Sequence, residues 1–239
     1  MQLTTQAIVF SSIKYGESSL IVKAFTASDG VKTYMLKGVL ASRKGRLKGA
    51  YFQPLTQLEL VVNHRNKGTL EHIREVRINY PYQDLHTHTV KRTISLFLAE
   101  MLAHSIREEE RNQELYNYLE AALQWLDTHE HIANFHIFFL LELTRYLGFY
   151  PDISGWKHPY FDLLEGCFTG NLPNGPSISG PELEHFKSFL GIEFDGLAEI
   201  RLGQKSRNSL LDILLQYYKI HLEGFNTPRS LAVLNEVFR

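Results

Sequence analysis

The chain has 239 residues, a formal net charge of −1 and a hydrophobic content of 44%, which is enough for one large domain or two ordinary ones. A single cysteine, Cys167, excludes an internal disulfide and any metal site built from several cysteines. The longest apolar run, Ile137–Leu141, is far shorter than the roughly 20 residues that span a bilayer. The N-terminus also lacks the pattern of a secretory signal, so we expect a cytoplasmic protein without a membrane partner.

The near-neutral total conceals a strong separation of charge along the chain. Residues 1–80 hold twelve Lys and Arg against five acids, a net charge of +7. Residues 81–239 hold thirteen bases against twenty-one acids, a net charge of −8. A basic field attracts polyanions over long distances, and nucleic acid is the commonest polyanion. The separation therefore predicts a basic module that binds a polyanion, followed by an acidic module.

The first 80 residues have the pattern of a small β-barrel. At residues 31–36, Val31, Thr33 and Met35 alternate with Lys32, Tyr34 and Leu36. This period of two residues is typical of a strand with two different faces. Similar runs occur at 6–12, 19–26, 55–62 and 69–78, and they are separated by turn-forming residues. Five short strands favour a closed barrel, because closure removes exposed sheet edges.

From residue 82 onward the hydrophobic pattern becomes helical. Apolar residues recur every three or four positions at 90–102, 115–126, 132–143 and 210–222. Ser179 and Glu182 have the spacing of a capping box that opens a short helix to about residue 190, and a last helix follows Pro228. Residues 151–178 are rich in Gly, Pro and Asn and predict an irregular region. The predicted fold class is α+β with several domains: a barrel at 1–80 and an all-helical domain at 81–239.

Cations and aromatic residues alternate on the first three predicted strands and in the loop that follows them. Cations neutralise phosphates, and aromatic faces stack on bases with little regard to sequence. Phe25 and Tyr34 are equally compatible with the hydrophobic core, and a single exposed lysine is usually only solvated. The candidate nucleic-acid-binding residues are Lys14, Tyr15, Lys23, Lys32, Tyr34, Lys37, Arg43, Lys44, Arg46 and Lys48.

Several segments, taken in order along the chain, resemble the RecO family of bacterial recombination mediators. Residues 7–22 form a strand, a Tyr-Gly-Glu-Ser turn and a second strand, which resembles the opening of that family. Residues 25–30 and 36–39 resemble its next strand pair, and residues 53–60 resemble its fourth strand. Residues 147–152 resemble its Leu-Gly-aromatic-x-Pro-Asp element. The resemblance covers nearly the whole chain and is specific as a set.

The resemblance implies an OB-fold followed by a helical domain, with no covalent chemistry and no cofactor. It implies binding of single- and double-stranded DNA and annealing of strands coated with single-strand-binding protein. It also implies cooperation with RecR in loading RecA, within the RecF pathway of recombinational DNA repair in the bacterial nucleoid. The helical domain would engage the acidic, hydrophobic C-terminal tail of single-strand-binding protein.

One region departs from the family pattern. Many RecO proteins carry a zinc-binding cysteine cluster after the Pro-Asp element, but residues 153–167 of this chain offer only His158 and Cys167 as ligands of that kind. Two such ligands cannot complete a four-ligand structural site. We therefore expect no metal, and we expect Trp156, Tyr160 and Phe161 to form the local core in its place.

The helical half offers few cations for an acidic peptide tail, and we expect them to rim an apolar groove. The available C-terminal cations are Arg201, Lys205, Arg207, Lys219 and Arg229, and the sequence does not choose among them.

Two other classes of function stay open. One is an adaptor whose acidic helical domain carries the main function by binding proteins, while the barrel only docks. The other is a hydrolase, which the sequence disfavours because it has no GxSxG, Walker A, GxGxxG or HExxH motif. The prediction is therefore a protein that is not an enzyme.

Overall fold

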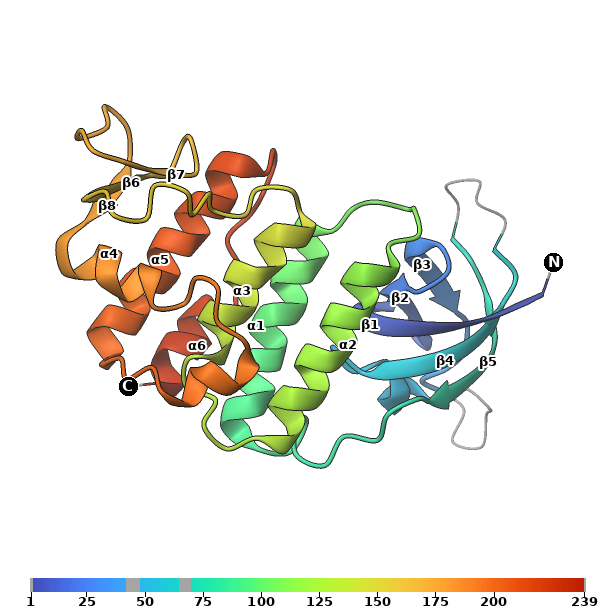
Figure 1. The fold of residues 1–239 in the computed structure, drawn as a ribbon. Coiled ribbons are helices and arrows are strands. Elements are labelled where there is room, and N and C mark those ends of the chain that lie inside the picture. The colour runs from blue at the N-terminus through green and yellow to red at the C-terminus, as the bar shows by residue number, and fades with distance from the viewer. Residues whose placement is uncertain (1, 42–47, 65–69, 239) are drawn as a thin grey trace. The chain divides into compact units, whose positions relative to one another are not determined.

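The computed structural model describes residues 2–41, 48–64 and 70–238 (Figure 1). Internal contacts divide the chain into two compact units. The first is Met1–Thr128 with Pro228–Ser230, and the second is His129–Thr227 with Leu231–Arg239. The predicted fold class is confirmed, since a five-stranded antiparallel sheet precedes a mainly helical region. The boundary at residue 80 stays a prediction, while the contacts group the first two helices with the sheet.

The five N-terminal strands form one sheet in the order β3-β2-β1-β4-β5. Their bounds are β1 Leu3–Tyr15, β2 Ser19–Thr26, β3 Gly30–Leu36, β4 Gln57–Val62 and β5 Ile73–Ile78, with a short 3₁₀ helix, η1, at Gly49–Phe52. The sheet closes through a parallel bridge between Tyr34 and Glu71. The Glu71 N–H donates to the Thr33 carbonyl at 2.8 Å, and the Met35 N–H donates to the Glu71 carbonyl at 2.9 Å. The result is the closed barrel that the strand count predicted.

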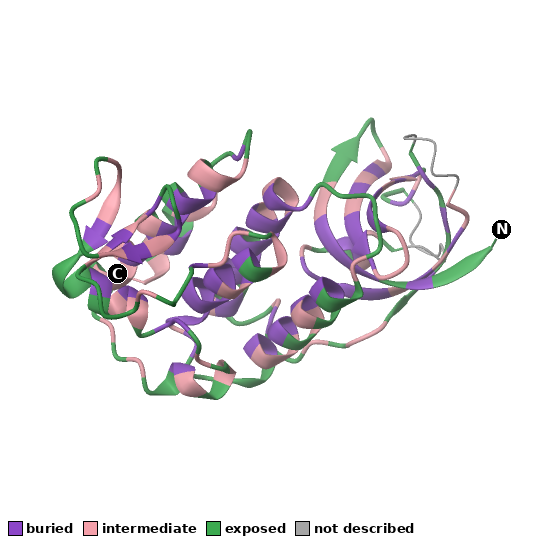
Figure 2. Ribbon diagram, turned by 45° about the horizontal axis from the view of Figure 1, so that its top comes forward, coloured by how far each residue is buried: buried purple, intermediate pink, exposed green. Residues whose placement is uncertain are grey.

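Burial alternates along β2 and β3 (Figure 2), because successive side chains of a strand point to opposite faces of the sheet. The interior is filled by small and branched residues around Tyr34 and Phe52: Ala7, Val9, Leu20, Val22, Ala24, Leu36, Val39, Leu58, Leu60, Val62, Ile73 and Val76. Part of the outer face is also covered. Phe25 points outward, where its ring stacks on Phe10 at 6.0 Å and on Tyr116 at 6.1 Å between centroids.

Helices α1 (Thr89–Ser105) and α2 (Gln113–Thr128) complete the first unit. Gln57 lies on β4 and is fully buried, so its amide needs partners. Its Nε2 donates to the Glu120 carbonyl at 3.2 Å, and its Oε1 accepts from Gln124 Nε2 at 3.2 Å. These bonds join α2 to the barrel, so the barrel and the first two helices act as one packed body.

A buried carboxylate fixes the segment that leads from the barrel into α1. Asp127, near the end of α2, accepts hydrogen bonds from the backbone N–H groups of Gln83, Asp84 and Leu85 at 2.8–2.9 Å. The buried Lys91 donates to the Asp127 backbone carbonyl and lies 3.6 Å from the Asp84 carboxylate. One aspartate therefore satisfies three backbone donors and ties the connecting segment to α2.

The second unit contains α3 (Phe135–Tyr146), α4 (Gly180–Lys187), η2 (Phe194–Ala198), α5 (Gln204–His221) and α6 (Leu231–Val237). The region predicted to be irregular also holds a short three-stranded sheet in the order β7-β6-β8, which the sequence pattern did not predict. Its strands are β6 Tyr160–Asp162, β7 Cys167–Thr169 and β8 Ser177–Ser179. Three residues are too few to display a period of two, which is why the sequence pattern missed them.

Aromatic packing forms the core beneath this small sheet, in part as expected. Phe161 is fully buried, and its ring lies 5.0 Å from Phe168 and 4.9 Å from Phe186. Trp156 remains 39% exposed and lies at the edge of this cluster. The predicted capping box is absent, because Ser179 makes no side-chain bond to α4. Its expected partner Glu182 accepts a hydrogen bond from the Ser209 hydroxyl at 2.6 Å instead.

Within the described part of the chain, no helix is both long enough and apolar enough to cross a membrane.

The Asp127 contacts lead to a prediction about stability. Asp127→Ala leaves three backbone N–H groups without their acceptor, so we expect the free energy of unfolding to fall by about 2–4 kcal/mol. Urea unfolding of the two proteins measures this difference. The control Asp84→Ala removes an exposed carboxylate 3.6 Å from Lys91 and should cost less than about 1 kcal/mol. Equal losses in the two variants would show that the backbone bonds to Asp127 contribute little.

A buried histidine makes the stability of the second unit depend on pH. His136 is 1% exposed, and its ring stacks on Phe238 at 5.3 Å. Burial, and secondarily the charge of Arg207, lower the pKa of His136 to about 3. The unfolded chain takes up a proton below its ordinary pKa of about 6.5, whereas the folded unit does not until about pH 3. Stability is therefore lost as the pH falls through this window.

We expect His136 to reduce the free energy of unfolding by about 2 kcal/mol between pH 7 and pH 5. Urea unfolding at both pH values, followed by Trp156 fluorescence in a Trp125→Phe background, measures the change. The same experiment with His136→Phe should lose this part of the pH dependence, whatever its absolute stability. An unchanged pH dependence in that variant would assign the effect to other groups.

Candidate nucleic-acid interface

Four of the candidate residues lie at one end of the barrel, around the turn between β1 and β2. Lys14 and Tyr15 are the last residues of β1, and Tyr15 is 56% exposed. Lys14 lies opposite Leu20 in the sheet, and Leu20 lies opposite Leu36. Lys37, which directly follows Leu36, is therefore at the same end of the barrel, and it is exposed.

The chain that leaves β3 folds back onto this end. The Leu40 N–H donates to the Ser18 carbonyl at 2.9 Å, which attaches residues 38–40 to the turn between β1 and β2. A Cβ built on Gly49 would lie 3.2 Å from Leu40 Cδ2 and 3.9 Å from Leu20 Cδ1. The exposed Lys48 therefore reaches the same end of the barrel. We call this region the hairpin-end surface; its polar and aromatic members are Lys14, Tyr15, Lys37 and Lys48.

The hairpin-end surface also has an apolar row that sequence reasoning missed. Ile13 lies opposite Ile21, and Ile21 lies opposite Met35, so the three side chains form a row across three strands on the outer face. Ile13 is 62% exposed and nearby Leu40 is 46% exposed. The sequence did contain a sign of this row, because Ile13, Tyr15 and Ile21 occupy the alternate strand positions opposite to those of Leu20 and Val22, which are buried. Lys37 has the phase of Met35 and so lies at the end of this apolar row, whereas Lys14 has the phase of the inward Leu20 and lies at the rim of the barrel.

Two of the candidate lysines are engaged within the first unit, which corrects their assignment to the exposed surface. Lys32 points inward in the phase of Leu36 and is buried, and its Nζ forms an ion pair with Glu109 at 3.1 Å. Lys23 is half-buried and donates to the Ala103 carbonyl at 2.7 Å. Burial, and secondarily the charge of Arg107, lower the pKa of Lys23. Neither amino group is available to a phosphate in this arrangement.

Tyr34 belongs to the barrel core, which corrects its assignment as a base-stacking residue. The residue is fully buried, and its hydroxyl lies 2.8 Å from His64 Nε2. His64 Nδ1 in turn lies 2.7 Å from the Asp29 carboxylate. Since a carboxylate only accepts, His64 Nδ1 carries a proton and donates it to Asp29. Burial, followed by the charges of Asp29 and Glu71, raises the pKa of Tyr34.

The loop candidates Arg43, Lys44 and Arg46 lie outside the described residues, so their place in the interface stays a prediction. The described ends of that loop, Ala41 and Lys48, are both exposed.

Acidic side chains border the opposite end of strands β2 and β3. Residues 108–110 are three consecutive glutamates in the connection between α1 and α2. The Val31 N–H donates to the Glu108 carbonyl at 2.9 Å, and Glu109 pairs with Lys32. A polyanion on the outer face is therefore repelled at this end and attracted at the hairpin-end surface.

The candidate cations of the helical region have different environments. Arg201, Lys205 and Lys219 are exposed residues of the second unit, whereas Arg229 is an exposed residue of the first. Arg207 is partly buried. Its guanidinium donates to the Leu202 carbonyl at 3.0 Å and the Asn134 side chain at 3.2 Å, and lies 5.3 Å from the centre of the Phe238 ring. We therefore interpret Arg207 as structural and remove it from the candidate peptide-binding set.

No group of three or more His, Cys, Asp or Glu side chains that could hold a metal ion occurs among the residues that the structure describes.

Comparisons with known proteins agree along the whole chain. The family model described as Recombination protein O N terminal matches residues 1–82, and the model described as Recombination protein O C terminal matches residues 89–231. The chain is 53% identical to the DNA repair protein RecO of Christiangramia forsetii over 238 residues, which cover 100% of both chains. It is 50% identical to the protein of that name from Flavobacterium psychrophilum, again over 100% of both chains. It is 34% identical to that of Bacteroides fragilis strain YCH46 over 98% of both.

The different environments of the two tyrosines lead to a prediction. Tyr15→Ala should weaken binding of a single-stranded oligonucleotide by roughly 1–3 kcal/mol, because an exposed ring that stacks on a base is lost. Tyr34→Phe should leave that affinity unchanged and lower the free energy of unfolding by about 1 kcal/mol, because it removes only the bond to His64. Fluorescence anisotropy and urea unfolding measure the two quantities. Equal affinity of Tyr15→Ala and the wild type would remove Tyr15 from the interface.

Proposed function

Because the chain belongs to the RecO family of DNA repair proteins, we propose that it is a DNA-binding recombination mediator that anneals complementary strands. The observation that carries the proposal is the hairpin-end surface, where exposed Lys14, Lys37 and Lys48 lie at the same end of the barrel as exposed Tyr15 and an apolar row. Lysine amino groups neutralise phosphates and release counterions, while the aromatic and apolar groups accept unstacked bases. A site of this composition suits single-stranded DNA.

Annealing requires that a strand be held without its pairing edges being occupied. A surface that binds phosphates and stacks on base faces leaves those edges free, because neither contact uses the hydrogen-bonding groups of the base. The acidic connection at residues 108–110 restricts a strand to one end of the barrel. A second strand can then pair with the exposed bases. This mechanism needs no covalent step, so we propose that the protein is not an enzyme and needs no cofactor.

The partners follow from the family. We propose that the protein binds both single- and double-stranded DNA, accepts strands coated with single-strand-binding protein, and acts with RecR in loading RecA in the bacterial nucleoid. The acidic tail of single-strand-binding protein needs cations beside apolar groups. Exposed Lys205 and Lys219 lie on α5, fourteen residues and therefore roughly 21 Å apart along one helix, nearly on one face. Arg201 precedes that helix. These three residues are the ones we propose for the tail.

An adaptor function remains the second candidate, because residues 81–239 carry a net charge of −8 and would repel DNA. The two proposals differ in their dependence on salt. Binding of DNA through lysine–phosphate contacts weakens steeply as salt rises. Weak DNA binding that stays the same from low to high salt would favour the adaptor.

A matched pair of double variants tests the proposal. Lys14→Gln/Lys37→Gln removes two charges from the hairpin-end surface, whereas Arg74→Gln/Arg77→Gln removes two from β5. We expect the first to reduce the slope of log K against log salt for single-stranded DNA by about 1.4 and to slow annealing of coated complementary strands. Arg74→Gln/Arg77→Gln should change the salt slope and the annealing rate much less. Equal effects would show that binding follows net charge alone, and no annealing by the wild type would contradict the mediator function.

A further inference from the structure

Strand β1 is longer than either of its neighbours and is paired only in part on each side. Leu3–Ile8 pair with β4, and Ala7–Tyr15 pair with β2. On the side of β1 that faces away from β4, the residues before Ala7 therefore have no partner strand in the described part of the chain, because β2 ends there and the chain turns into β3. This start of β1 is exposed at Leu3 and Thr4.

The hydrogen bonds of neighbouring residues show which backbone groups face the unpaired side. The Val9 N–H donates to the Thr56 carbonyl, toward β4, while the Gln6 carbonyl accepts from the Ala27 N–H, on the side of β2. Backbone groups alternate in direction along a strand. Thr4 has the same phase as Gln6, so its N–H and C=O point to the side where β2 has ended. These groups are a template for one more short strand.

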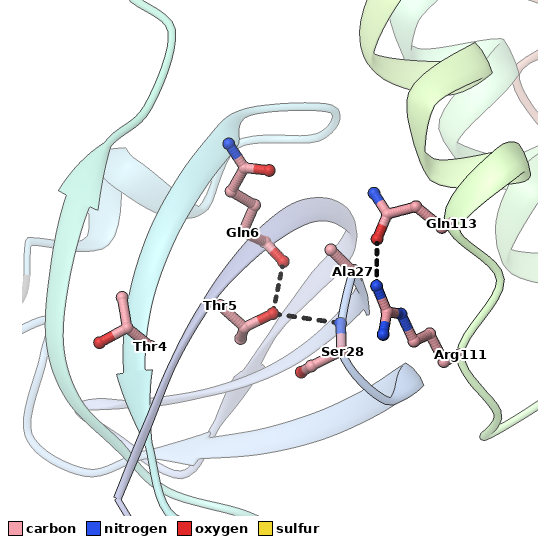
Figure 3. Close-up of a pocket in the computed structure, with 7 residues that line it drawn as sticks. All are labelled: Thr4, Thr5, Gln6, Ala27, Ser28, Arg111 and Gln113. Atoms are coloured by element: carbon pink, nitrogen blue, oxygen red, sulfur yellow. Dashed lines mark hydrogen bonds between the residues drawn. The ribbon is translucent and has the colours of Figure 1, made fainter.

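A slot lies against this edge. It has a volume of about 380 Å³ and is lined by Thr4, Thr5, Gln6, Ala27, Ser28, Arg111 and Gln113 (Figure 3). The turn that closes its inner end is fixed, because the Ser28 N–H donates to the Thr5 hydroxyl at 3.3 Å. Arg111 and Gln113 form the opposite wall, and the Arg111 guanidinium donates to Gln113 Oε1 at 3.3 Å. The lining carries one cation and no acidic side chain.

The position of Arg111 is set by the close packing of the connection between α1 and α2 on the turn between β2 and β3. Gly30 has a φ of +65°, and a Cβ there would lie 2.7 Å from the Glu108 carbonyl oxygen. Only glycine allows this approach. The bond from Val31 to Glu108 fixes the same contact. Arg111, three residues later, is thereby held beside the slot.

From this geometry we infer that the slot receives an extended peptide segment of a partner protein. The segment adds to β1 as a short strand at Thr4 and places an Asp or Glu side chain against Arg111. Main-chain pairing at a free sheet edge supplies affinity, and a charged pocket beside it supplies selectivity. DNA fits less well, because the flanking glutamates at 108–110 repel a polyanion while a single carboxylate needs only Arg111.

The test uses the full chain and a capped heptapeptide of alternating threonine and valine with one central aspartate. A second peptide with asparagine at that position is the matched control. We expect the aspartate peptide to slow amide hydrogen exchange at Thr4 and to bind about tenfold more tightly than the asparagine peptide. Arg111→Gln should remove this tenfold difference, and Arg111→Lys should retain part of it.

A backbone variant separates strand addition from simple surface adhesion. Thr4→Pro removes an N–H that takes no part in the ladder with β4, so the barrel should fold while peptide binding falls at least about tenfold. Thr4→Ala keeps the N–H and should bind as the wild type does. If Thr4→Pro fails to fold, the Arg111 variants and the amide exchange at Thr4 still show whether the peptide binds in the slot.

Three results would overturn the inference. The first is unchanged exchange at Thr4 in saturating peptide. The second is equal affinity for the aspartate and asparagine peptides, in the wild type as in Arg111→Gln. The third is protection of Thr4 by a single-stranded oligonucleotide but not by peptide, which would make the slot part of the DNA interface.

Discussion

Closure of the barrel through the backbone of Glu71 is the constraint on which the rest of the first unit depends. The two bonds between Glu71 and β3 join the ends of a five-stranded sheet, so each strand acquires one inward and one outward face. On β3 the inward face is that of Tyr34 and Leu36, and the outward face carries Met35. The apolar row from Ile13 to Met35 is outward for this reason alone.

The separation of charge seen along the sequence occurs inside the first unit. Residues 1–128 hold sixteen bases and thirteen acids, because α1, α2 and their connections bring acids to the basic barrel. The glutamates at 108–110 contact the ends of β2 and β3 that lie away from the turn between β1 and β2. Among the described residues of β2 and β3, the glutamates therefore repel a polyanion at one end, while the hairpin-end surface attracts it at the other.

Local patterns predicted the strands and helices well, because alternation and helical periodicity act over a few residues. β2 was predicted at its observed bounds, 19–26. The roles of Lys32 and Tyr34 could not be predicted, since a shift of one residue in phase exchanges the two faces of a strand and only barrel closure sets that phase. Lys14 and Tyr15, beside a turn at a strand end, stay exposed in either phase. The partner of Lys32 is 77 positions away in the sequence, which no local pattern reveals.

The length of β1 connects the two proposed sites. A strand of thirteen residues beside neighbours of eight and six cannot be paired along its whole length on either side. Its last residues carry Lys14 and Tyr15 beyond the ladder with β4, and its first residues extend Thr4 beyond the ladder with β2. The Gly30 turn sets the point where β2 ends and holds the connection that carries Arg111. One mismatch in strand length thus gives the barrel a surface suited to DNA at one end and an edge suited to peptide at the other.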